Sequence, residues 1–282
     1  MGVLNAMTVD IEDYFHVQAF ADVVAPADWD HYPSRVERNT LRLLEIFACR
    51  GIRASFFVLG WVAEKCPTLV RQICQAGHRV GCHGYAHRAI YEGDESDFRK
   101  DLRKAKRTIE DILGAAVHSY RAPSYSITAR TLWALEILGE EGFEFDSSIY
   151  PIVHDRYGIP GAPRFPHLRN LQCGRQIKEF PPSTLRILGS NIPVAGGGYL
   201  RLLPYKTTAW AIHYLNHREK QPAMVYLHPW EIDPDQPRIS ASWRSRFRHY
   251  HNLDSTETKC LKLLSDFTWG PMEEVLAQKL VQ

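Results

Sequence analysis

Short apolar segments alternate with longer amphipathic segments over the first 150 residues of the chain. The longest amphipathic segment repeats apolar residues at helical spacing under a heavily charged opposite face. Helices are expected at 36–51, 61–77, 94–114 and 128–142. The short apolar segments predict strands at 3–11, 52–60, 78–84, 117–122 and 143–148. This alternation indicates parallel βαβ units, and because no glycine-rich dinucleotide fingerprint accompanies them, we expect an α/β barrel rather than an open sheet.

The composition of the chain changes after Tyr150, where proline, glycine, histidine and arginine become frequent. A long loop region is expected there, of the kind that carries sites rather than core. A helix is predicted at 205–217, an apolar strand at 223–231 and a last helix at 254–267. Because no repeat or linker divides the chain, we expect one barrel domain over 1–230 and a C-terminal extension, 231–282, that packs on the barrel.

The composition fits an ordinary folded protein. Hydrophobic residues make up 45% and charged residues 23% of the 282 residues, which excludes a disordered chain. The formal net charge of +2 is too small to indicate binding to nucleic acid or to an anionic membrane. No apolar run approaches the roughly 20 residues that a membrane span needs. Histidine is the unusual component, with 13 residues.

Targeting and redox signals favour a cytoplasmic location. The first 15 residues lack the basic and apolar regions of a secretory signal peptide and contain three acidic residues by position 13. The six cysteines show no CxxC spacing, and they are scattered among predicted helices and strands. We therefore expect free thiols in a reducing compartment rather than disulfides.

Three carboxylates and two imidazoles follow predicted strands. Asp10, Glu12 and Asp13 lie at the C-terminal end of the first strand, where parallel barrels place catalytic groups and where a cation or an arginine must compensate buried charge. His83 and His87 follow the third strand, and Gly84 between them allows a tight turn. Two imidazoles and one carboxylate make an open catalytic metal site. The alternatives are a solvated acidic turn and a chance pair of surface histidines.

Three further polar residues follow later strands. Arg121 precedes Pro123, which fixes the loop, and a fixed guanidinium is suited to holding a carboxylate. Asp146 follows residues 143–145 of the predicted fifth strand in the same way, although it also fits a turn cap. His228 follows the apolar strand near the end of the barrel, beside Trp230. This position favours a general acid, and a histidine bonded to backbone in the core is the alternative.

These residues belong to five motifs that occur in a fixed order, namely residues 10–13, HGYAH (83–87), RAPSY (121–125), DSSIY (146–150) and LH (227–228). The order resembles that of the NodB-homology polysaccharide deacetylases, carbohydrate esterase family 4, over nearly all of residues 1–230. The segments VDIEDYFH, GCHGYAH, RAPSYSI and LHPWEIDPDQPR further resemble the bacterial subfamily encoded at exosortase and exopolysaccharide loci. That subfamily has its own C-terminal extension.

The resemblance implies a distorted (β/α)7-type barrel and a divalent metal, most often zinc. It assigns His83 and His87 to the metal and Asp10 to the general base, oriented by Arg121. His228 becomes the general acid. It also implies that the backbone around Ser124 and Tyr125 stabilises the oxyanion, and we add Tyr150 and Trp230 as substrate contacts.

The chain departs from the family pattern in two places. The usual pair of adjacent aspartates is spread over residues 10–13, so the metal carboxylate is either Glu12 or Asp13, and a turn after Ile11 leads us to prefer Asp13. Ile149 stands where the family commonly has a second aspartate that tunes the acid histidine. Asp146 and Glu231 are the candidates for that role.

The leading hypothesis is a metal-dependent hydrolase that removes N-acetyl groups from N-acetylhexosamine residues of an exopolysaccharide, a peptidoglycan-like polymer or a precursor. The expected partner is then a carbohydrate substrate, and the sequence leaves open whether the protein forms a homo-oligomer. One alternative is a metal-independent amide hydrolase that resembles allantoinase. Another is a glycan-binding relative without catalysis, against which the joint presence of Asp10, His83, His87, Arg121 and His228 argues.

Overall fold

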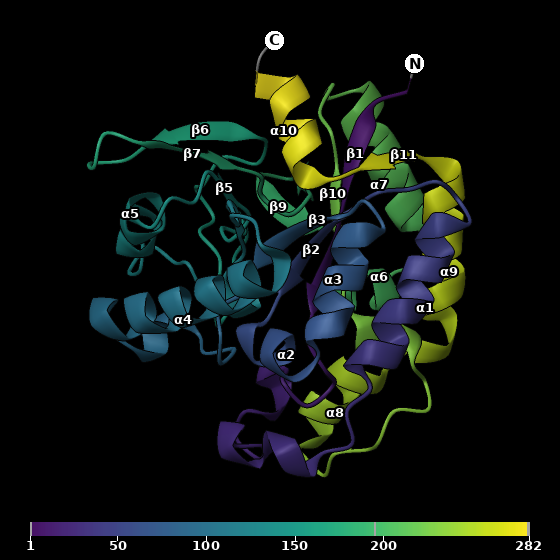
Figure 1. The fold of residues 1–282 in the computed structure, drawn as a ribbon. Helices are drawn as coiled ribbons and strands as arrows, with labels where there is room; N and C mark the ends of the chain where they lie inside the picture. Colours follow the sequence, from purple (N-terminus) through teal and green to yellow (C-terminus); the bar gives the residue numbers. More distant parts are fainter. Residues whose placement is uncertain (1, 195, 281–282) are drawn as a thin grey trace.

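The computed structural model describes residues 2–194 and 196–280. Its centre is a mixed sheet whose seven parallel strands follow the spatial order β10, β1, β2, β3, β4, β5, β7 (Figure 1). These are Met224–Leu227, Leu4–Ile11, Ser55–Val58, Arg79–Cys82, Ser119–Tyr120, Phe145–Asp146 and Gln176–Glu179. β6 (His167–Asn170) runs antiparallel to β7 at one edge. The parallel order of β1 to β5 agrees with the predicted βαβ units.

Residues of β1 alternate between two environments. Met7, Val9 and Ile11 belong to the larger hydrophobic cluster, which includes residues of the helices. Ala6 packs in a second cluster with aromatic residues of β2 and β10. Because Thr8 and Asp10 share the face of Ala6, the strand brings a hydroxyl and a carboxylate into the same buried space.

The helices of the first half are α1 (Val36–Ala48), α2 (Gly60–Lys65), α3 (Pro67–Gln75), α4 (Glu95–Leu113) and α5 (Trp133–Glu140). Asp94 caps α4 by accepting a hydrogen bond from the backbone N–H of Asp97, and Gly114 ends the helix in the left-handed conformation. The prediction of one helix at 61–77 is wrong. Pro67 begins α3 because a proline ring fits a first helical turn but interrupts an ongoing helix.

The second half contains more structure than a loop region. Two antiparallel hairpins, β6–β7 and β8–β9, occupy the region after Tyr150, with β8 at Thr184–Ile187 and β9 at Ser190–Pro193. Their strands are short and mostly polar, so they lack the apolar runs by which strands are recognised. α6 (Gly197–Leu202) and α7 (Tyr205–His217) follow, and α7 has the predicted bounds.

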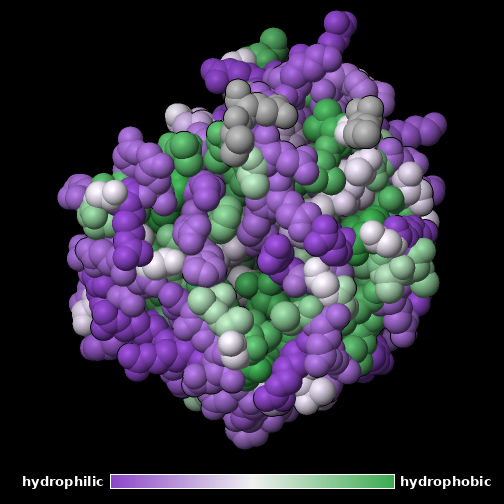
Figure 2. All heavy atoms as spheres, turned by 45° about the horizontal axis from the view of Figure 1, so that its top comes forward, coloured by the Kyte–Doolittle hydropathy of each residue, from purple (hydrophilic) through white to green (hydrophobic). Residues whose placement is uncertain are grey.

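The C-terminal residues pack on the central sheet. β11 (Thr268–Gly270) pairs in parallel with β1, and α10 (Met272–Leu280) contacts the same strand. α8 (Trp243–Tyr250) and α9 (Leu253–Asp266) lie between β10 and β11 in the chain. The domain boundary at 230 stays a prediction. None of the helices in the described ranges is long and apolar enough to cross a membrane. The face in Figure 2 is largely hydrophilic, with hydrophobic side chains gathered in separate patches.

Candidate active site

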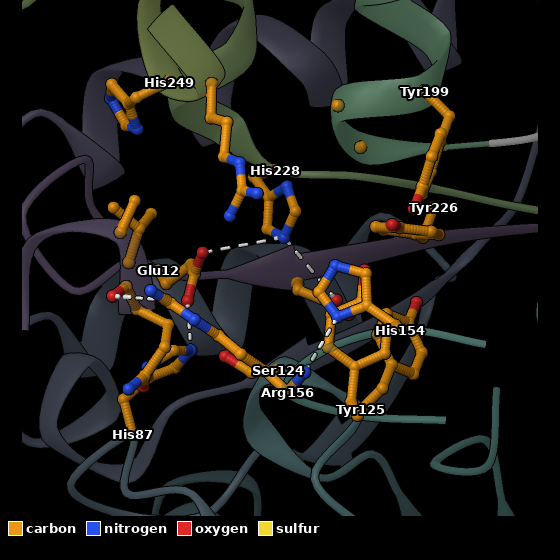
Figure 3. A pocket seen from close by; sticks show the side chains of 18 of the residues that line it. Glu12, His87, Ser124, Tyr125, His154, Arg156, Tyr199, Tyr226, His228 and His249 are labelled. Atoms are coloured by element: carbon orange, nitrogen blue, oxygen red, sulfur yellow. Dashed lines mark hydrogen bonds and ion pairs between the residues drawn. The ribbon is translucent and has the colours of Figure 1, made fainter. Parts of the chain in front are cut away.

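A pocket of about 780 Å³ opens beside the carboxyl ends of the parallel strands. Asp10 and Glu12 reach it from the end of β1, His83 and His87 from the loop after β3, and His228 from the end of β10. The second half of the chain supplies much of the remaining lining (Figure 3), with His154, Arg156, Tyr157, Tyr199, Tyr226, Arg248 and His249. The structure therefore brings together residues that lie more than 200 positions apart in the sequence.

Glu12, His83 and His87 form a cluster that could hold a metal ion. One ligand atom from each lies within 4.8 Å of the others, and all three side chains are buried. Glu12 Oε2 lies 2.6 Å from His87 Nε2. His83 Nδ1 lies 2.8 Å from the carbonyl oxygen of Arg121, so Nε2 is the free nitrogen of that ring. The cluster has the two imidazoles and one carboxylate of an open catalytic metal site.

The loop that carries the two histidines is held by a residue the sequence reading missed. Asp101 on α4 accepts hydrogen bonds from the backbone N–H groups of Tyr85 (2.7 Å) and Ala86 (3.1 Å). Gly84 and His87 both have positive φ, at 73° and 49°. This tight turn lets both imidazoles face one point. Asp101 gave no local signal in the sequence because it lies on the charged face of a long helix.

The electrostatics of the cluster favour a cation. Burial lowers the pKa of His83 to about 4, so its imidazole is neutral at pH 7. Burial by itself raises the pKa of Glu12, but His87 and His228 lower it below its usual value. Glu12 therefore stays ionised, and its Oε2 lies 2.6 Å from His87 Nε2. A buried anionic oxygen this close to an imidazole nitrogen, with a second imidazole nearby, is an arrangement that suits a shared cation.

Asp13 lies apart from the cluster of Glu12, His83 and His87. This position does not fit the preference for Asp13 as the metal ligand. Its Oδ2 accepts hydrogen bonds from the backbone N–H groups of Arg35 and Val36 at the start of α1, and from the Ser34 hydroxyl at 2.8 Å. Burial raises its pKa despite these donors. Glu12, directly after β1, instead lines the pocket together with Asp10. Asp13 therefore anchors the start of a helix.

Asp10 and Arg121 form a buried ion pair beside this cluster. Arg121 Nη1 lies 2.7 Å from Asp10 Oδ1, and the guanidinium is fully buried. It also donates to the Thr8 hydroxyl at 2.9 Å and, through Nε and Nη2, to the carbonyl and hydroxyl oxygens of Ser147. Its carbon lies 4.3 Å from the ring centre of Phe57. With its donors directed in this way, Arg121 fixes one oxygen of Asp10 and leaves Oδ2 toward the pocket.

His228 belongs to a second buried charge network. Its Nδ1 lies 3.0 Å from Glu231 Oε2, and Glu231 Oε1 accepts a hydrogen bond from Arg201 Nε at 2.7 Å. Its Nε2 lies 3.5 Å from Glu12 Oε1 and 3.8 Å from Asp10 Oδ2. Burial opposes protonation, but Glu231 and Glu12 together raise the pKa of His228 to about 9. At neutral pH this imidazole therefore carries a proton that it can donate.

Trp230 connects the two networks. Its ring stacks between His228 and His249, with ring centres 5.2 Å and 4.1 Å away and interplanar angles of 19°. Its Nε1–H donates to Glu12 Oε1 at 3.2 Å. Trp230 thus orients the Glu12 carboxylate as well as lining the pocket.

Asp146 does not join this site. It lies outside the pocket lining, beside Glu179, and its Oδ1 accepts a 2.6 Å hydrogen bond from the Ser148 hydroxyl. Burial raises the pKa of both Asp146 and Glu179, and the negative charge of Asp146 raises that of Glu179 further, so the pair shares a proton. Of the two candidates for tuning His228, Glu231 has the required contact and Asp146 does not, because its side chain turns back into its own loop.

The RAPSY loop offers one free backbone donor. Ser124 and Tyr125 both have positive φ, at 54° and 52°. The Tyr125 N–H donates to the Ala122 carbonyl at 3.0 Å, which leaves the Ser124 N–H as the only one of the two without a backbone acceptor within the described ranges. Tyr150 lies under this loop, fully buried against Tyr125, and does not line the pocket.

Two family models match the chain. Residues 27–142 match the polysaccharide deacetylase model, and residues 147–277 match a domain of unknown function, DUF3473. The first part of the chain is therefore similar to polysaccharide deacetylase domains. The deacetylase match includes His83, His87 and Arg121, whereas the DUF3473 match includes Trp230, His228 and the helix α8. Asp10 and Glu12 lie before both matches and are joined to them by the structure alone.

Curated proteins are also similar to parts of the chain. A peptidoglycan-N-acetylglucosamine deacetylase of Bacillus cereus is 32% identical over 98 residues, which are 34% of this chain and 36% of the relative. A peptidoglycan deacetylase of Helicobacter pylori is 33% identical over 111 residues, 38% of this chain and 36% of the relative. The chain thus spans little more than a third of the length of these two proteins.

Solved structures show the same fold over most of the chain. A peptidoglycan N-acetylglucosamine deacetylase with 15% identity aligns with a TM-score of 0.52, covering 96% of this chain and 86% of that one. The Puue allantoinase gives 0.62 at 12% identity, covering 98% and 89%. A carbohydrate esterase family 4 pseudoenzyme of Bacillus anthracis gives 0.50 at 16% identity, covering 98% and 66%. The predicted distorted (β/α) barrel of the deacetylase fold is confirmed.

Proposed function

We propose that the protein is a metal-dependent N-deacetylase that acts on N-acetylhexosamine residues of a glycan. The observation that carries the proposal is the meeting of three groups in one pocket. A cluster of two imidazoles and a carboxylate lies beside an arginine-oriented Asp10 and a glutamate-oriented His228. Amide hydrolysis needs a base on one side of the carbonyl carbon and an acid on the other, and this pocket supplies both.

The residues present fit a divalent metal, and we propose zinc. Glu12, His83 and His87 are ligand types that zinc binds, and one ligand atom from each buried side chain lies within 4.8 Å of the others. A bound zinc ion would supply Lewis acidity and make a water molecule more acidic. The carbonyl of Arg121 orients His83, and Trp230 orients Glu12, so both ligands have the supporting contacts that such sites require.

The other residues have separate roles in the proposed reaction. Asp10, held by Arg121, accepts the proton of the attacking water through the oxygen that faces the pocket. The free N–H of Ser124 donates to the oxygen of the tetrahedral intermediate. His228, protonated at neutral pH, donates its proton to the nitrogen that departs as the sugar amine. Glu231 keeps that imidazole charged and oriented until the transfer.

The substrate we propose is a polysaccharide or its precursor. The relatives from Bacillus cereus and Helicobacter pylori are named as peptidoglycan deacetylases, which supports an N-acetylated glycan. The wall of His154, Tyr157, Tyr199 and Tyr226 offers aromatic faces to sugar rings. The resemblance of the motifs to the exopolysaccharide-locus subfamily supports an exopolysaccharide as the substrate. The cytoplasmic location of the protein stays a prediction.

Acetate release from N-acetylglucosamine oligomers tests the proposal. It is measured for the zinc-loaded protein, for the same protein after chelation and for His83→Ala, with metal content determined in each sample. Release by the loaded protein and loss of at least about 100-fold in the other two is the expected result. No release by a folded, zinc-loaded sample, or equal release in all three, would contradict it.

Two alternatives give different outcomes in the same experiment. The fold is shared with an allantoinase and with a pseudoenzyme, so fold similarity alone does not separate them. Turnover of a ureide by metal-free protein would favour an amide hydrolase of the allantoinase kind. Glycan binding by a zinc-loaded sample without acetate release would favour a binding protein.

A further inference from the structure

The helix α8 has its apolar side chains on the outside. Trp243 is 73% exposed and Phe247 is 49% exposed, and because they are four residues apart they share one face of the helix. His249, on another face, is buried and stacks on Trp230. α8 is therefore anchored to the protein through His249 and Tyr250 while it presents two aromatic rings to the surroundings.

Arginine residues flank this aromatic face. At 100° per residue, Arg244 and Arg248 lie on one side of the Trp243–Phe247 stripe and Arg246 on the other. All three are exposed. The segment 237–251 contains four arginines and no acidic residue, on a chain whose net charge is only +2. In the part of the chain that the structure describes, none of the four forms an ion pair.

A shallow depression adjoins the helix. It has a volume of about 320 Å³ and is lined by Arg238, Arg246, Trp243 and Tyr250. The Arg238 guanidinium lies 4.3 Å from the ring centre of Tyr250, which holds it in place. Two guanidinium groups between aromatic rings suit a phosphate attached to an apolar body.

The helix also borders the candidate active site. Arg248 lines the large pocket together with two apolar residues of its rim, Val153 and Leu202, which are 82% and 46% exposed. An apolar, basic rim of this kind continues the surface of α8 to the mouth of the pocket. A surface that binds α8 would therefore lie next to that mouth.

We propose that α8 docks the protein on the surface of an anionic phospholipid bilayer, with Trp243 and Phe247 inserted at the headgroup level and the arginines on lipid phosphates. A central apolar stripe with cations on both sides is the pattern of a helix that lies in a membrane interface. Attraction of the unpaired arginines to anionic lipid supplies the charge complementarity. The pocket mouth then faces glycans that are attached to, or lie near, the membrane. The docking itself does not depend on the proposed deacetylation.

Vesicle flotation tests the docking directly. The full chain is mixed with vesicles of phosphatidylcholine alone, or of phosphatidylcholine with phosphatidylglycerol, and the bound fraction is measured at low and high salt. Binding to the anionic vesicles that weakens with salt is expected. Trp243→Ala with Phe247→Ala should lower the partition constant at least about tenfold. Arg244→Gln with Arg246→Gln should lower it about 25-fold, at about fivefold per arginine.

Matched controls come from other parts of the surface. Trp210→Ala replaces a 56% exposed tryptophan of α7, and Arg107→Gln with Arg130→Gln removes two exposed arginines. These variants should bind as the native chain does, and circular dichroism should show that all variants are folded. Absence of binding to anionic vesicles, or equal losses in control and α8 variants, would overturn the proposal. Binding of α8 to soluble polygalacturonate without flotation would overturn it in favour of a glycan platform.

Discussion

Two charge networks end in the pocket, and the groups at their ends carry opposite charges. In the first, the carboxylate of Asp10 faces the pocket and the guanidinium of Arg121, which belongs to the deacetylase match, lies behind it. In the second, within the DUF3473 match, the imidazole of His228 faces the pocket, Glu231 lies behind it and Arg201 behind Glu231. Because the group that faces the pocket is anionic in one network and cationic in the other, one network is suited to take a proton and the other to give one.

The two networks also differ in the number of cationic partners that compensate each buried carboxylate. Asp10 has the single close cation Arg121, and His228 Nε2 is 3.8 Å from its other oxygen. Glu231 has two close partners, Arg201 at 2.7 Å and His228 at 3.0 Å. A buried charge with two partners tolerates the loss of one better than a charge with a single partner.

The largest effect is therefore expected for Arg121. Arg121→Met leaves the Asp10 carboxylate buried without its cation and should cost about 3–5 kcal/mol of unfolding free energy. Arg201→Met should cost less because His228 still compensates Glu231. Urea unfolding of both variants measures the difference. Equal losses would break the distinction between the two networks.

Substitution of Glu12 should affect zinc binding, whereas substitution of Asp13 should affect stability. Glu12→Gln removes the charge from the metal cluster and should weaken zinc binding by at least about 100-fold while the fold is retained. Asp13→Asn should leave zinc affinity unchanged and lower stability, because the carboxylate accepts three hydrogen bonds at the start of α1. Competitive titration with a zinc chelator measures the first and thermal unfolding the second. A loss of zinc affinity in Asp13→Asn alone would restore Asp13 as the ligand.

Substitution of Trp230 should also weaken zinc binding, but by less than substitution of Glu12. Trp230→Phe keeps a stacked ring between His228 and His249 but removes the N–H that donates to Glu12. Zinc affinity should fall about tenfold, as for other groups that orient a metal ligand. Trp269→Phe is the matched control, because its Nε1–H donates to the Leu263 carbonyl far from the cluster. Unchanged zinc affinity in Trp230→Phe would limit Trp230 to lining the pocket.

The smallest effect concerns the buried pair behind the pocket. Burial and the charge of Asp146 raise the pKa of Glu179 well above its usual value. A group with a raised folded-state pKa stabilises the fold fully below its unfolded pKa and loses that contribution as the pH rises through the folded value. Glu179→Gln should therefore gain stability over the native chain as the pH increases. Melting temperatures across the pH range test this, and a gain that grows toward acid pH would contradict the assignment.

Strong local patterns predicted much of this structure. The apolar run of β1 and the helical spacing of α4 predicted elements of the barrel. Asp10, Glu12, His83, His87 and His228, which the motifs singled out, line one pocket, and their roles stay predictions. The choice between Glu12 and Asp13 as the metal ligand depended on whether the chain turns after Ile11. Three donors near the start of α1 hold the Asp13 carboxylate, and they come from another part of the chain. Such distant contacts leave no trace in a local pattern.

The missed elements have a physical reason as well. α8 was not predicted because its aromatic residues face outward, so its pattern resembles an irregular basic segment. The net charge of +2 argued against an anionic membrane, yet four arginines lie together in 237–251 without a neighbouring acid in that segment. A sum over the whole chain hides such a local concentration of charge.

Anomalous diffraction at the zinc edge, on crystals of the zinc-loaded protein, tests the central claim most directly. The account predicts one strong peak within bonding distance of Glu12, His83 and His87, about 2.0–2.2 Å from each ligand atom. A peak beside Asp13, or a loaded crystal with no peak in this pocket, would contradict it.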